Sequence, residues 1–323
     1  MIKKEETVKT EAIKFRHVSM NPHIKKRMKE IEGIEILFDV PMSQYTTLRV
    51  GGIAEALCKA RNLEALKEIM AFLVDNKIPY LVTGRGSNLL VRDEGLKGVA
   101  IILEGSLAAI NRNTMAEPYI VAGAGTPLYE LVAFCLENGL SGAEFLAGIP
   151  GTVGGGVAMN AGSWGQEMKD VITEVTILTG RGGVEKRERE VLAFDYRGLE
   201  LNAGEIILNA MLNLSFENSA LIREKVSSFI QQRKERFPLD MPSAGSIFKN
   251  PEGDYAGRLI DAVGLKGKMI GGAMISPKHA NFIVNKGNAS SSDILALMNL
   301  AIVKVREMFN IRLLPEIKVI GEM

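Results

Sequence analysis

The segment Gly-Arg-Gly-Ser-Asn at 84–88 is the first place where residue types and spacing could support chemistry. It follows an apolar run, and glycine lets the backbone turn sharply so that peptide N–H groups converge. Successive N–H groups can form an anion-binding concavity without a helix dipole. A simple turn between two elements explains the same residues equally well, so this segment alone leaves phosphate binding open.

A second glycine segment, Ala-Gly-Ile-Pro-Gly-Thr-Val-Gly-Gly-Gly-Val-Ala-Met-Asn at 147–160, is more specific. Pro150 fixes φ, and the missing side chains from Gly154 onward let a flat or charged ligand touch the main chain. So much glycine weakens any helix or strand that contains it, a cost that folding alone explains poorly. The segment therefore predicts close contact between a ligand and the backbone.

Neither segment has the spacing of the two commonest phosphate-binding motifs. Gly-x-Gly occurs at 84, 123, 154 and 180, but no glycine stands three residues after the second glycine of any pair. The dinucleotide fingerprint G-x-G-x-x-G and the P-loop are therefore absent. A nucleotide bound here would need another fold.

Three motifs together carry a close resemblance to one enzyme family. Thr-Thr-Leu-Arg-Val-Gly-Gly at 46–52, Gly-Arg-Gly-Ser-Asn-Leu-Leu at 84–90 and Ala-Gly-Ile-Pro-Gly-Thr-Val-Gly-Gly at 147–155 stand in its order and spacing. From about residue 40 onward the chain resembles the UDP-N-acetylenolpyruvoylglucosamine reductases. The resemblance implies an FAD domain of the vanillyl-alcohol oxidase type, in which glycine loops between two small α+β subdomains hold the pyrophosphate.

The resemblance also implies a reaction. NADPH would reduce FAD, and flavin N5 would pass hydride to the β-carbon of the enolpyruvyl group in UDP-N-acetylglucosamine enolpyruvate. The product would be UDP-N-acetylmuramate, a precursor of bacterial peptidoglycan. Such a reduction needs a cation or proton donor for the developing enolate, and an acid that protonates the α-carbon.

The segment Ser-Ala-Gly-Ser-Ile-Phe-Lys-Asn-Pro at 243–251 resembles the most distinctive motif of the family. By this resemblance Ser246 is the proton donor. Serine is a poor acid in water, so it would need a strongly basic carbanion beside it and donors such as Lys249 near its oxygen. A turn or capping serine is the alternative role.

Two other motifs match catalytic positions of the family. In Leu-Pro-Glu-Ile-Lys-Val-Ile-Gly at 314–321, Glu316 is implied to assist protonation or to polarise the substrate carboxylate as a neutral acid. In Asp-Tyr-Arg-Gly at 195–198, Arg197 is implied to stabilise the enolate, although Leu199 stands where the family commonly has serine. An exposed strand glutamate and a surface arginine are the alternatives.

The remaining implied contacts concern the cofactor and the substrate. For FAD, the matching residues are Arg49, Gly84, Arg85, Gly86, Ser87, Asn88, Leu89, Ile149, Pro150, Gly151, Thr152, Gly154, Gly155, Asn160 and Ala161. For the UDP-sugar, they are Arg233, Lys234, Lys249, Asn250 and His279. Phosphates favour both arginine forks and lysine charges, but a solvated basic helix end has the same composition. The other histidines form no metal-ligand pattern, so no metal is expected.

The surrounding sequence predicts the elements that must position these residues. Apolar residues at helical spacing predict a helix that Asn62 caps, and further helices begin at 127, 219, 255 and 292. Strands are predicted at 53–60, 80–83, 99–103, 119–122, 171–179, 205–216 and 317–320. Short strands alternating with helices predict the α+β class.

These elements divide into parts. Residues 41–218 are expected to form a two-subdomain FAD-binding domain, residues 219–310 a smaller α+β substrate-binding domain, and residues 311–323 a C-terminal strand that carries Glu316. Residues 1–40 are expected to be a polar arm, either mobile or a surface helix. The short connection before 219 favours the form of the family that lacks a substrate-covering tyrosine loop.

Composition limits the remaining possibilities. The chain has 323 residues, of which 46% are apolar and 24% charged, with a net charge of +1 and 2 cysteines. These values fit an ordinary globular protein and argue against a nucleic-acid surface or a disulfide framework. No apolar run suits a signal peptide or a membrane helix, so a small-molecule enzyme of the cytoplasm is expected.

Two other functions stay open on sequence grounds. An oxidase of the same flavin fold would keep the glycine loops, but it has no reason to keep Ser246 and Glu316 in these contexts. A non-catalytic sensor of flavin or UDP-sugar would bind the same ligands. Bleaching of the bound flavin by NADPH would separate a reductase from both.

Overall fold

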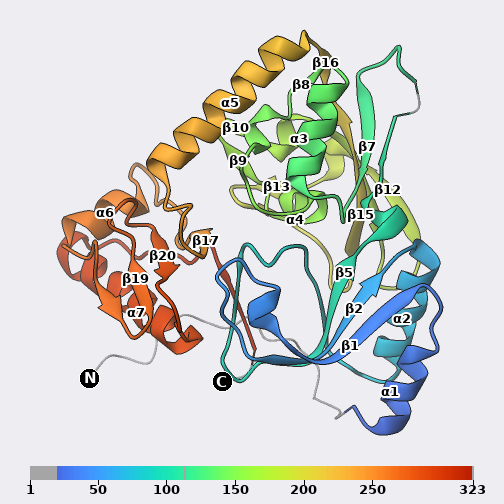
Figure 1. Cartoon of the computed structure of the whole chain (residues 1–323), viewed down its shortest axis with the longest axis horizontal. Helices are drawn as coiled ribbons and strands as arrows, with labels where there is room; N and C mark the ends of the chain where they lie inside the picture. The colour runs from blue at the N-terminus through green and yellow to red at the C-terminus, as the bar shows by residue number, and fades with distance from the viewer. Residues whose placement is uncertain (1–19, 113, 322–323) are drawn as a thin grey trace.

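The computed structural model describes residues 20–112 and 114–321, which form three packed parts (Figure 1). In Figure 1 the first subdomain, in blue, lies below the second subdomain, in green, and the orange and red C-terminal part lies beside both. Helices and strands are mixed throughout, so the predicted α+β class is confirmed. Residues 1–19 of the segment expected to form a polar arm, 1–40, lie outside the described residues.

The first subdomain is built on a four-stranded sheet with the order β1-β2-β5-β3. Its elements are α1 (Pro22–Lys29), β1 (Ile34–Pro41), β2 (Ile53–Ala60), α2 (Leu63–Asp75), β3 (Tyr80–Val82), β4 (Leu89–Val91) and β5 (Leu96–Leu103). The strand at 53–60 and the helix capped by Asn62 are confirmed: the Asn62 side chain accepts a hydrogen bond from the Ala65 N–H at 2.9 Å. The cap fixes where α2 begins, and its apolar face packs on the sheet.

Part of the expected polar arm belongs to this sheet. β1 runs antiparallel to β2, with Ile34 opposite Ala60 and Pro41 opposite Ile53. α1 precedes it and buries Ile24 and Met28. β1 is the edge strand that completes the sheet, and apart from Glu35 and Asp39 its residues are apolar, so this part of the expected arm is not polar in composition.

The second subdomain is built on a five-stranded sheet with the order β12-β11-β15-β7-β6. Its elements are β6 (Ile110–Asn111), β7 (Tyr119–Gly123), α3 (Leu128–Glu137), β8 (Leu140–Ser141), α4 (Val153–Ala158), β9 (Gly162–Ser163), β10 (Gln166–Glu167), β11 (Ile172–Leu178), β12 (Val184–Glu188), β13 (Phe194–Asp195), β14 (Gly198–Leu199), β15 (Ile206–Asn213) and β16 (Ser215–Phe216). β11 and β15, which correspond to the strands predicted at 171–179 and 205–216, pair with each other. The second glycine segment, 147–160, contains the whole of α4, which packs against β15 and β7.

The helix α5 (Ser219–Arg236) connects the second subdomain to the C-terminal part. It begins where predicted, but its apolar residues pack on the second subdomain, and Phe229 stacks on Trp164 with ring centroids 5.6 Å apart. By its contacts α5 lies with the FAD-binding part, although the sequence placed it in the substrate-binding part. No helix among residues 20–112 and 114–321 is long and apolar enough to cross a membrane.

The C-terminal part has a four-stranded sheet with the order β17-β20-β19-β18. Its elements are β17 (Ser243–Ser246), α6 (Ala256–Ala262), β18 (Met269–Ile270), β19 (Ala273–Ile275), β20 (Phe282–Asn285) and α7 (Ser291–Phe309). The final strand β21 (Lys318–Ile320) leaves this part and pairs in parallel with β4. The residues that follow α7 therefore return to the first subdomain.

The Asp93 carboxylate makes a second connection between the C-terminal part and the first subdomain, in addition to the pairing of β21 with β4. Asp93, just after β4, accepts hydrogen bonds from the Ser291 N–H at 2.7 Å, the Ser292 N–H at 3.1 Å and the Ser292 hydroxyl at 2.9 Å. In return the Asp93 N–H donates to Ser291 Oγ at 2.9 Å. Asp93 thus caps the N-terminus of α7 from another part of the chain, where a negative charge is favourable.

We expect Asp93→Ala to lower the free energy of unfolding by about 1–3 kcal/mol. The variant loses the carboxylate that caps α7, so the buried Ser291 N–H loses its acceptor. Burial alone would raise the pKa of the Asp93 carboxyl, but the bonds from Ser291 and Ser292 outweigh it and the pKa is lowered. This contribution is therefore present above the unfolded pKa and is lost as pH falls through the folded pKa. Urea titrations at pH 7 and at about pH 3 should show a smaller gap between wild type and variant at the lower pH, whereas an equal gap would contradict the capping role.

Candidate active site

A cavity of about 980 Å³ lies where the two subdomains meet the C-terminal part. Its wall includes residues from 44–49, 84–85 and 102–105 of the first subdomain, from 125–130 and 148–152 of the second, and from 239–243 after α5. Pockets that bury a cofactor or a drug-sized ligand have volumes of about 300–1,000 Å³. The volume therefore suits a ligand as large as a dinucleotide.

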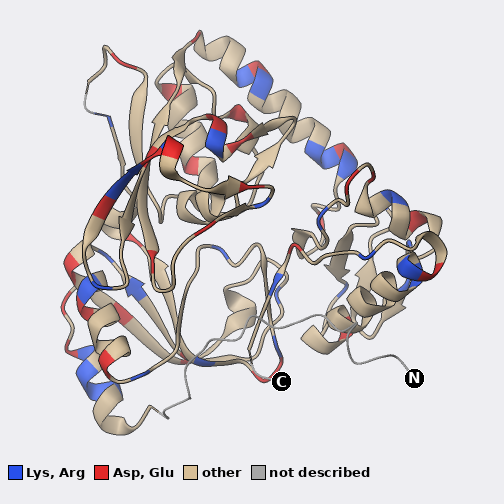
Figure 2. Ribbon diagram, turned by 180° about the vertical axis from the view of Figure 1, so that it is seen from behind, with Lys and Arg blue, Asp and Glu red and all other residues tan. Residues whose placement is uncertain are grey.

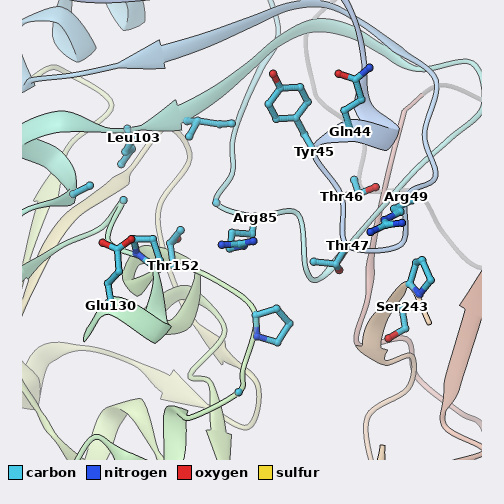
Figure 3. Close-up of a pocket in the computed structure, with 18 of the residues that line it drawn as sticks. Gln44, Tyr45, Thr46, Thr47, Arg49, Arg85, Leu103, Glu130, Thr152 and Ser243 are labelled. Atoms are coloured by element: carbon cyan, nitrogen blue, oxygen red, sulfur yellow. The ribbon is translucent and has the colours of Figure 1, made fainter. Parts of the chain in front are cut away.

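The side chains in Figure 3 come from both subdomains. Arg85 lies between Glu130 and Thr152 on one side and Thr47 and Arg49 on the other. The Arg85 guanidinium also lies 5.8 Å from the centre of the Tyr129 ring. Two exposed arginines therefore reach one cavity, and positive charge of this kind suits a phosphate-containing ligand.

The first glycine loop passes very close to its neighbours. A Cβ at Gly84 would lie 2.4 Å from Thr152 Oγ1, in the second glycine loop. A Cβ at Gly86, whose φ is +60°, would lie 2.3 Å from the carbonyl oxygen of Tyr45. Only glycine fits these positions, so the two loops and the 44–49 segment can meet at one place.

The first glycine loop has peptide N–H groups that could donate hydrogen bonds to a ligand. None of the peptide N–H groups of 84–87 has a hydrogen-bond acceptor among the described residues. Thr47 Oγ1, on the facing segment, is buried and likewise has no partner within the described chain. Buried polar groups normally find partners. These donors and the nearby Arg49 and Arg85 fit the pyrophosphate of FAD.

Gly86→Ala should lower the FAD content of the purified protein, because its Cβ would push the loop away from Tyr45. Gly182→Ala is the matched control: its φ is +82°, and nothing lies within 4 Å of the added Cβ. The control should cost only the left-handed backbone penalty of about 1–2 kcal/mol and keep its flavin. Flavin absorbance per protein and the melting temperature measure both effects; equal flavin content in the two variants would contradict a role for this loop.

The predicted FAD residues do not all reach the cavity. Arg49, Gly84, Arg85, Pro150 and Thr152 line it, while Gly154 and Gly155 line an adjoining chamber of about 150 Å³. Of the others, Gly86, Ser87, Asn88, Ile149 and Gly151 lie in the same two loops, and Leu89 is buried at the start of β4.

Asn160 and Ala161 lie behind the second loop. Asn160 is fully buried, its Nδ2 donates to Glu167 at 2.8 Å and to the Asp195 carbonyl at 3.1 Å, and its Oδ1 accepts from the Lys169 N–H at 3.1 Å. The Ala161 N–H donates to the Gly156 carbonyl. These groups hold the loop and the 195–198 segment together, so their direct contact with FAD stays a prediction.

Arg197 and Glu316, far apart in sequence, form an ion pair. Arg197 Nε lies 3.2 Å from Glu316 Oε1, although its N–H does not point at the oxygen, and Arg197 Nη1 donates to the Gly162 carbonyl at 3.2 Å. Burial raises the pKa of the Glu316 carboxyl, while the charges of Arg197 and Lys249 act in the opposite direction. Glu316 is therefore easier to protonate than an ordinary glutamate.

The backbone of Glu316 ties this pair to two other motifs. Its N–H donates to the Ile247 carbonyl at 2.8 Å, directly after Ser246. Its carbonyl accepts from Asn88 Nδ2, in the first glycine loop, at 3.1 Å. The structure thus brings together the glycine loop, the Ser246 motif and the C-terminal motif, as the predicted catalytic set requires.

Lys249 joins the fourth motif to this group. Its Nζ donates to the carbonyl of Tyr196 at 3.2 Å, beside Arg197. Leu199, which stands where the family commonly has serine, is buried in the β13–β14 hairpin opposite Phe194. At that position the chain therefore has a buried apolar side chain instead of a side-chain hydroxyl.

The basic end of α5 points to the C-terminal part, and Figure 2 shows its Lys and Arg beside that part. Arg233 lies 5.1 Å from the Phe237 ring and against Gly148, and its Nε is buried without a partner among the described residues. Burial lowers the pKa of its guanidinium to about 10. Lys234 is exposed on the same turn.

Two other predicted substrate residues have structural contacts. Asn250 Oδ1 accepts from the Ala256 N–H at 3.1 Å, at the start of α6. His279 packs against the rings of Phe237 and Phe282, and burial lowers the pKa of its imidazole. Neither residue lines the cavity, so their contact with substrate stays a prediction.

Sequence reasoning missed several residues of the cavity wall. Tyr45 and Thr47 belong to the segment that begins the motif at 46–52, from which only Arg49 was selected. Ser243 begins the Ser246 motif and also lines the cavity. Glu130, in the first turn of α3, had no sequence signal, because nothing near it suggests a ligand.

Comparison with known proteins agrees with this geometry. Residues 54–187 match an FAD binding domain family, and residues 237–320 match the family described as the C-terminal domain of UDP-N-acetylenolpyruvoylglucosamine reductase. The reductase of that name from Caldanaerobacter subterraneus subsp. tengcongensis is 41% identical over 92% of this chain and 97% of its own length. The one from Listeria monocytogenes is 40% identical over 90% of this chain and 96% of its own.

A solved structure extends the comparison to the fold. UDP-N-acetylenolpyruvylglucosamine reductase from Thermus caldophilus matches with a TM-score of 0.76 and 38% identity, over 89% of this chain and 99% of that one. Identity at this level, over nearly the full length of each relative, covers the FAD-binding and C-terminal parts together. The chain belongs to the UDP-N-acetylenolpyruvoylglucosamine reductase family.

Proposed function

We propose that this enzyme uses NADPH and FAD to reduce UDP-N-acetylglucosamine enolpyruvate to UDP-N-acetylmuramate in peptidoglycan precursor synthesis. The carrying observation is the contact of three distant motifs: Arg197 Nε lies 3.2 Å from Glu316 Oε1, and the Glu316 N–H donates to the Ile247 carbonyl. Ser243 of the Ser246 motif lines the cavity, whereas Arg197, Ser246 and Glu316 are not among its lining residues. The matches to named reductases along the chain support the same substrate.

FAD would be held by the two glycine loops, with the free N–H groups of 84–87, Thr47, Arg49 and Arg85 around its pyrophosphate. Bound FAD supplies hydride transfer, from NADPH to the flavin and from flavin N5 to the β-carbon of the enolpyruvyl group.

The protein's own residues would manage charge and protons. Negative charge that develops on the substrate carboxylate would be stabilised by Arg197 and by the neutral form of Glu316, because burial raises the pKa of that carboxyl. Ser246 would donate its hydroxyl proton to the α-carbon, and Lys249, three residues further on, would favour the resulting alkoxide by its charge. The half-buried position of Ser246 is consistent with access to a ligand.

The phosphates of the substrate would lie near the end of α5. Arg233 is buried with an unpartnered Nε, and Lys234 lies beside it. A short connection, Glu217 and Asn218, joins β16 to α5, as the form of the family without the tyrosine loop requires. No tyrosine-bearing loop is inserted between these two elements.

Anaerobic spectroscopy of the FAD-bound protein tests the proposal. NADPH should bleach the flavin, and UDP-N-acetylglucosamine enolpyruvate should restore the oxidised spectrum with formation of UDP-N-acetylmuramate. A flavin that NADPH does not bleach would favour an oxidase or a sensor. A flavin that NADPH bleaches but the UDP-sugar does not reoxidise would contradict the substrate.

A further inference from the structure

Asn281 is a buried polar residue to which no part of the reaction has been assigned, and it lies against the Ser246 motif. Its side chain is 3% exposed. Both of its amide atoms bond to one residue: Oδ1 accepts from the Phe248 N–H at 3.0 Å, and Nδ2 donates to the Phe248 carbonyl at 2.8 Å. The Asn281 carbonyl also accepts from the Ile247 N–H at 2.9 Å.

The pairing between β17 and β20 ends at Ser246, and the bonds from Asn281 take the place of strand pairing for the residues that follow. β17 pairs with β20 at Ser243 and Ser246, with an irregularity between them, and no paired residue follows Ser246 in that ladder. Beyond it, the Asn281 side chain reproduces the donor and acceptor of a partner strand. Because buried backbone groups need partners, Asn281 determines where the chain runs immediately after Ser246.

The other edge of the same segment carries Glu316. The Ile247 carbonyl accepts from the Glu316 N–H at 2.8 Å, and the Lys249 N–H donates to the Leu314 carbonyl at 2.8 Å. Ile247 and Phe248 are therefore fixed between Asn281 on one side and the Glu316 segment on the other. A shift of this segment would move Ser246 relative to Glu316.

We propose that Asn281 is a positioning residue that sets the placement of Ser246 relative to Glu316 and thereby governs protonation of the substrate. This inference rests on the proposed function. Asn281 itself is held by its own N–H, which donates to His279 Nδ1 at 3.2 Å. The segment 279–281 thus supports the reaction through the backbone of the Ser246 motif and needs no contact with substrate.

The experiment separates the two half-reactions in the FAD-bound full chain. Reduction by NADPH requires no proton on a substrate carbon, whereas reoxidation by UDP-N-acetylglucosamine enolpyruvate does. Asn281→Ala should leave the first rate within a few-fold of wild type and slow the second by about 10²-fold, the effect expected of a misplaced reacting group. The solvent deuterium isotope effect on reoxidation should rise, because proton transfer becomes slower than hydride transfer.

Asn285→Ala is the matched control. Asn285 is the last residue of β20, the strand that begins directly after Asn281; it is 8% exposed, and its amide bonds to Leu48, Gly287 and Ala289 instead of to the Ser246 motif. It should lower stability without changing the ratio of the two half-reaction rates. An equal change of that ratio in both variants would show that Asn281 acts only through general stability.

Two further variants keep the test decisive if Asn281→Ala folds poorly. Asn281→Asp can accept from the Phe248 N–H but can donate to its carbonyl only when protonated, so its reoxidation rate relative to wild type should recover at low pH. In a Ser246→Ala background, Asn281→Asp should cause little further loss, because residues that act as a unit are not additive. Fully additive losses, or no recovery at low pH, would overturn the proposal. A wild type that fails to turn over would contradict the proposed function instead.

Discussion

Ser246→Ala should slow reoxidation of the reduced flavin by UDP-N-acetylglucosamine enolpyruvate by about 10²–10⁴-fold, the usual contribution of a positioned acid. The variant should still bind FAD and still be bleached by NADPH, because the half-buried hydroxyl makes no hydrogen bond to another described residue that the fold would lose. Anaerobic stopped-flow absorbance measures the two half-reactions separately.

The serine control is Ser228→Ala. Ser228 is exposed on α5 and accepts only from Gln232 Nε2, so its loss should leave both rates unchanged. If Ser246→Ala reoxidises at the wild-type rate, the proton comes from another donor, and water or Glu316 becomes the next candidate. Slowing of NADPH reduction by the same factor would indicate a fault in flavin binding.

Glu316→Gln should lower the rate of substrate reduction by about 10²–10³-fold, comparable to the loss of one preorganised donor to a developing negative charge. Burial raises the pKa of the Glu316 carboxyl, so its neutral form persists to higher pH than in an ordinary glutamate. The wild-type reoxidation rate should fall as pH rises through this raised pKa, because the carboxyl then loses its proton. Glutamine does not titrate, so the variant should lack that limb of the profile.

A pH series of single-turnover reoxidation rates tests this result. Glu307→Gln, which removes an exposed carboxylate on α7 that pairs with Lys304 at 2.8 Å, is the control and should keep the wild-type profile. A pH limb that persists unchanged in Glu316→Gln would assign the titration to another group. A reoxidation rate that rises with pH in wild type would mean that Glu316 acts as a carboxylate instead of as an acid.

Local patterns predicted the elements with strong periodicity. β2 and α2 follow the expected ranges because their apolar spacing and the Asn62 cap are properties of a few consecutive residues. The first glycine loop was also predicted, and the structure gives the reason for its composition: side chains at Gly84 and Gly86 would collide with Thr152 and Tyr45. The second glycine segment contains the helix α4, which the sequence did not predict.

Elements at the edges of sheets were harder to predict. β12 is an exposed edge strand in which four charged residues, 185–188, follow Val184, and such a strand has the composition of a loop. β1 is also an edge strand, but its sequence is mostly apolar, and it was grouped with the polar segment that precedes it. α5 was predicted as a helix, but which part it packs on depends on Trp164, a residue that no local pattern connects with Phe229. The composition of a segment indicates how exposed it is to solvent, but it does not indicate which other element the segment packs against.

The proposed catalytic residues come together through contacts between segments that are distant in sequence. Nothing in the local sequence of Arg197 or Glu316 shows that the two meet at 3.2 Å, and only the resemblance to a family joined them. Asn281 escaped selection because its role is to bond to the backbone of Phe248, a contact that depends on the final fold. A residue that acts by bonding to the backbone of another residue belongs to no recognisable catalytic or binding motif, so sequence patterns do not reveal it.

The pairing of β21 with β4 has a consequence for biosynthesis. Asn88 and Glu316, whose contact closes this pairing, are separated by 228 residues. At translation rates of about 5–20 residues per second, the ribosome makes the first of these segments about 10–50 s before the second. During that interval the apolar β4 has no strand beside it and is exposed to aggregation or to chaperones, while β7, β11 and β15 already have each other. The second subdomain can therefore fold on the ribosome, and the catalytic centre is assembled only when the strand after Glu316 has emerged.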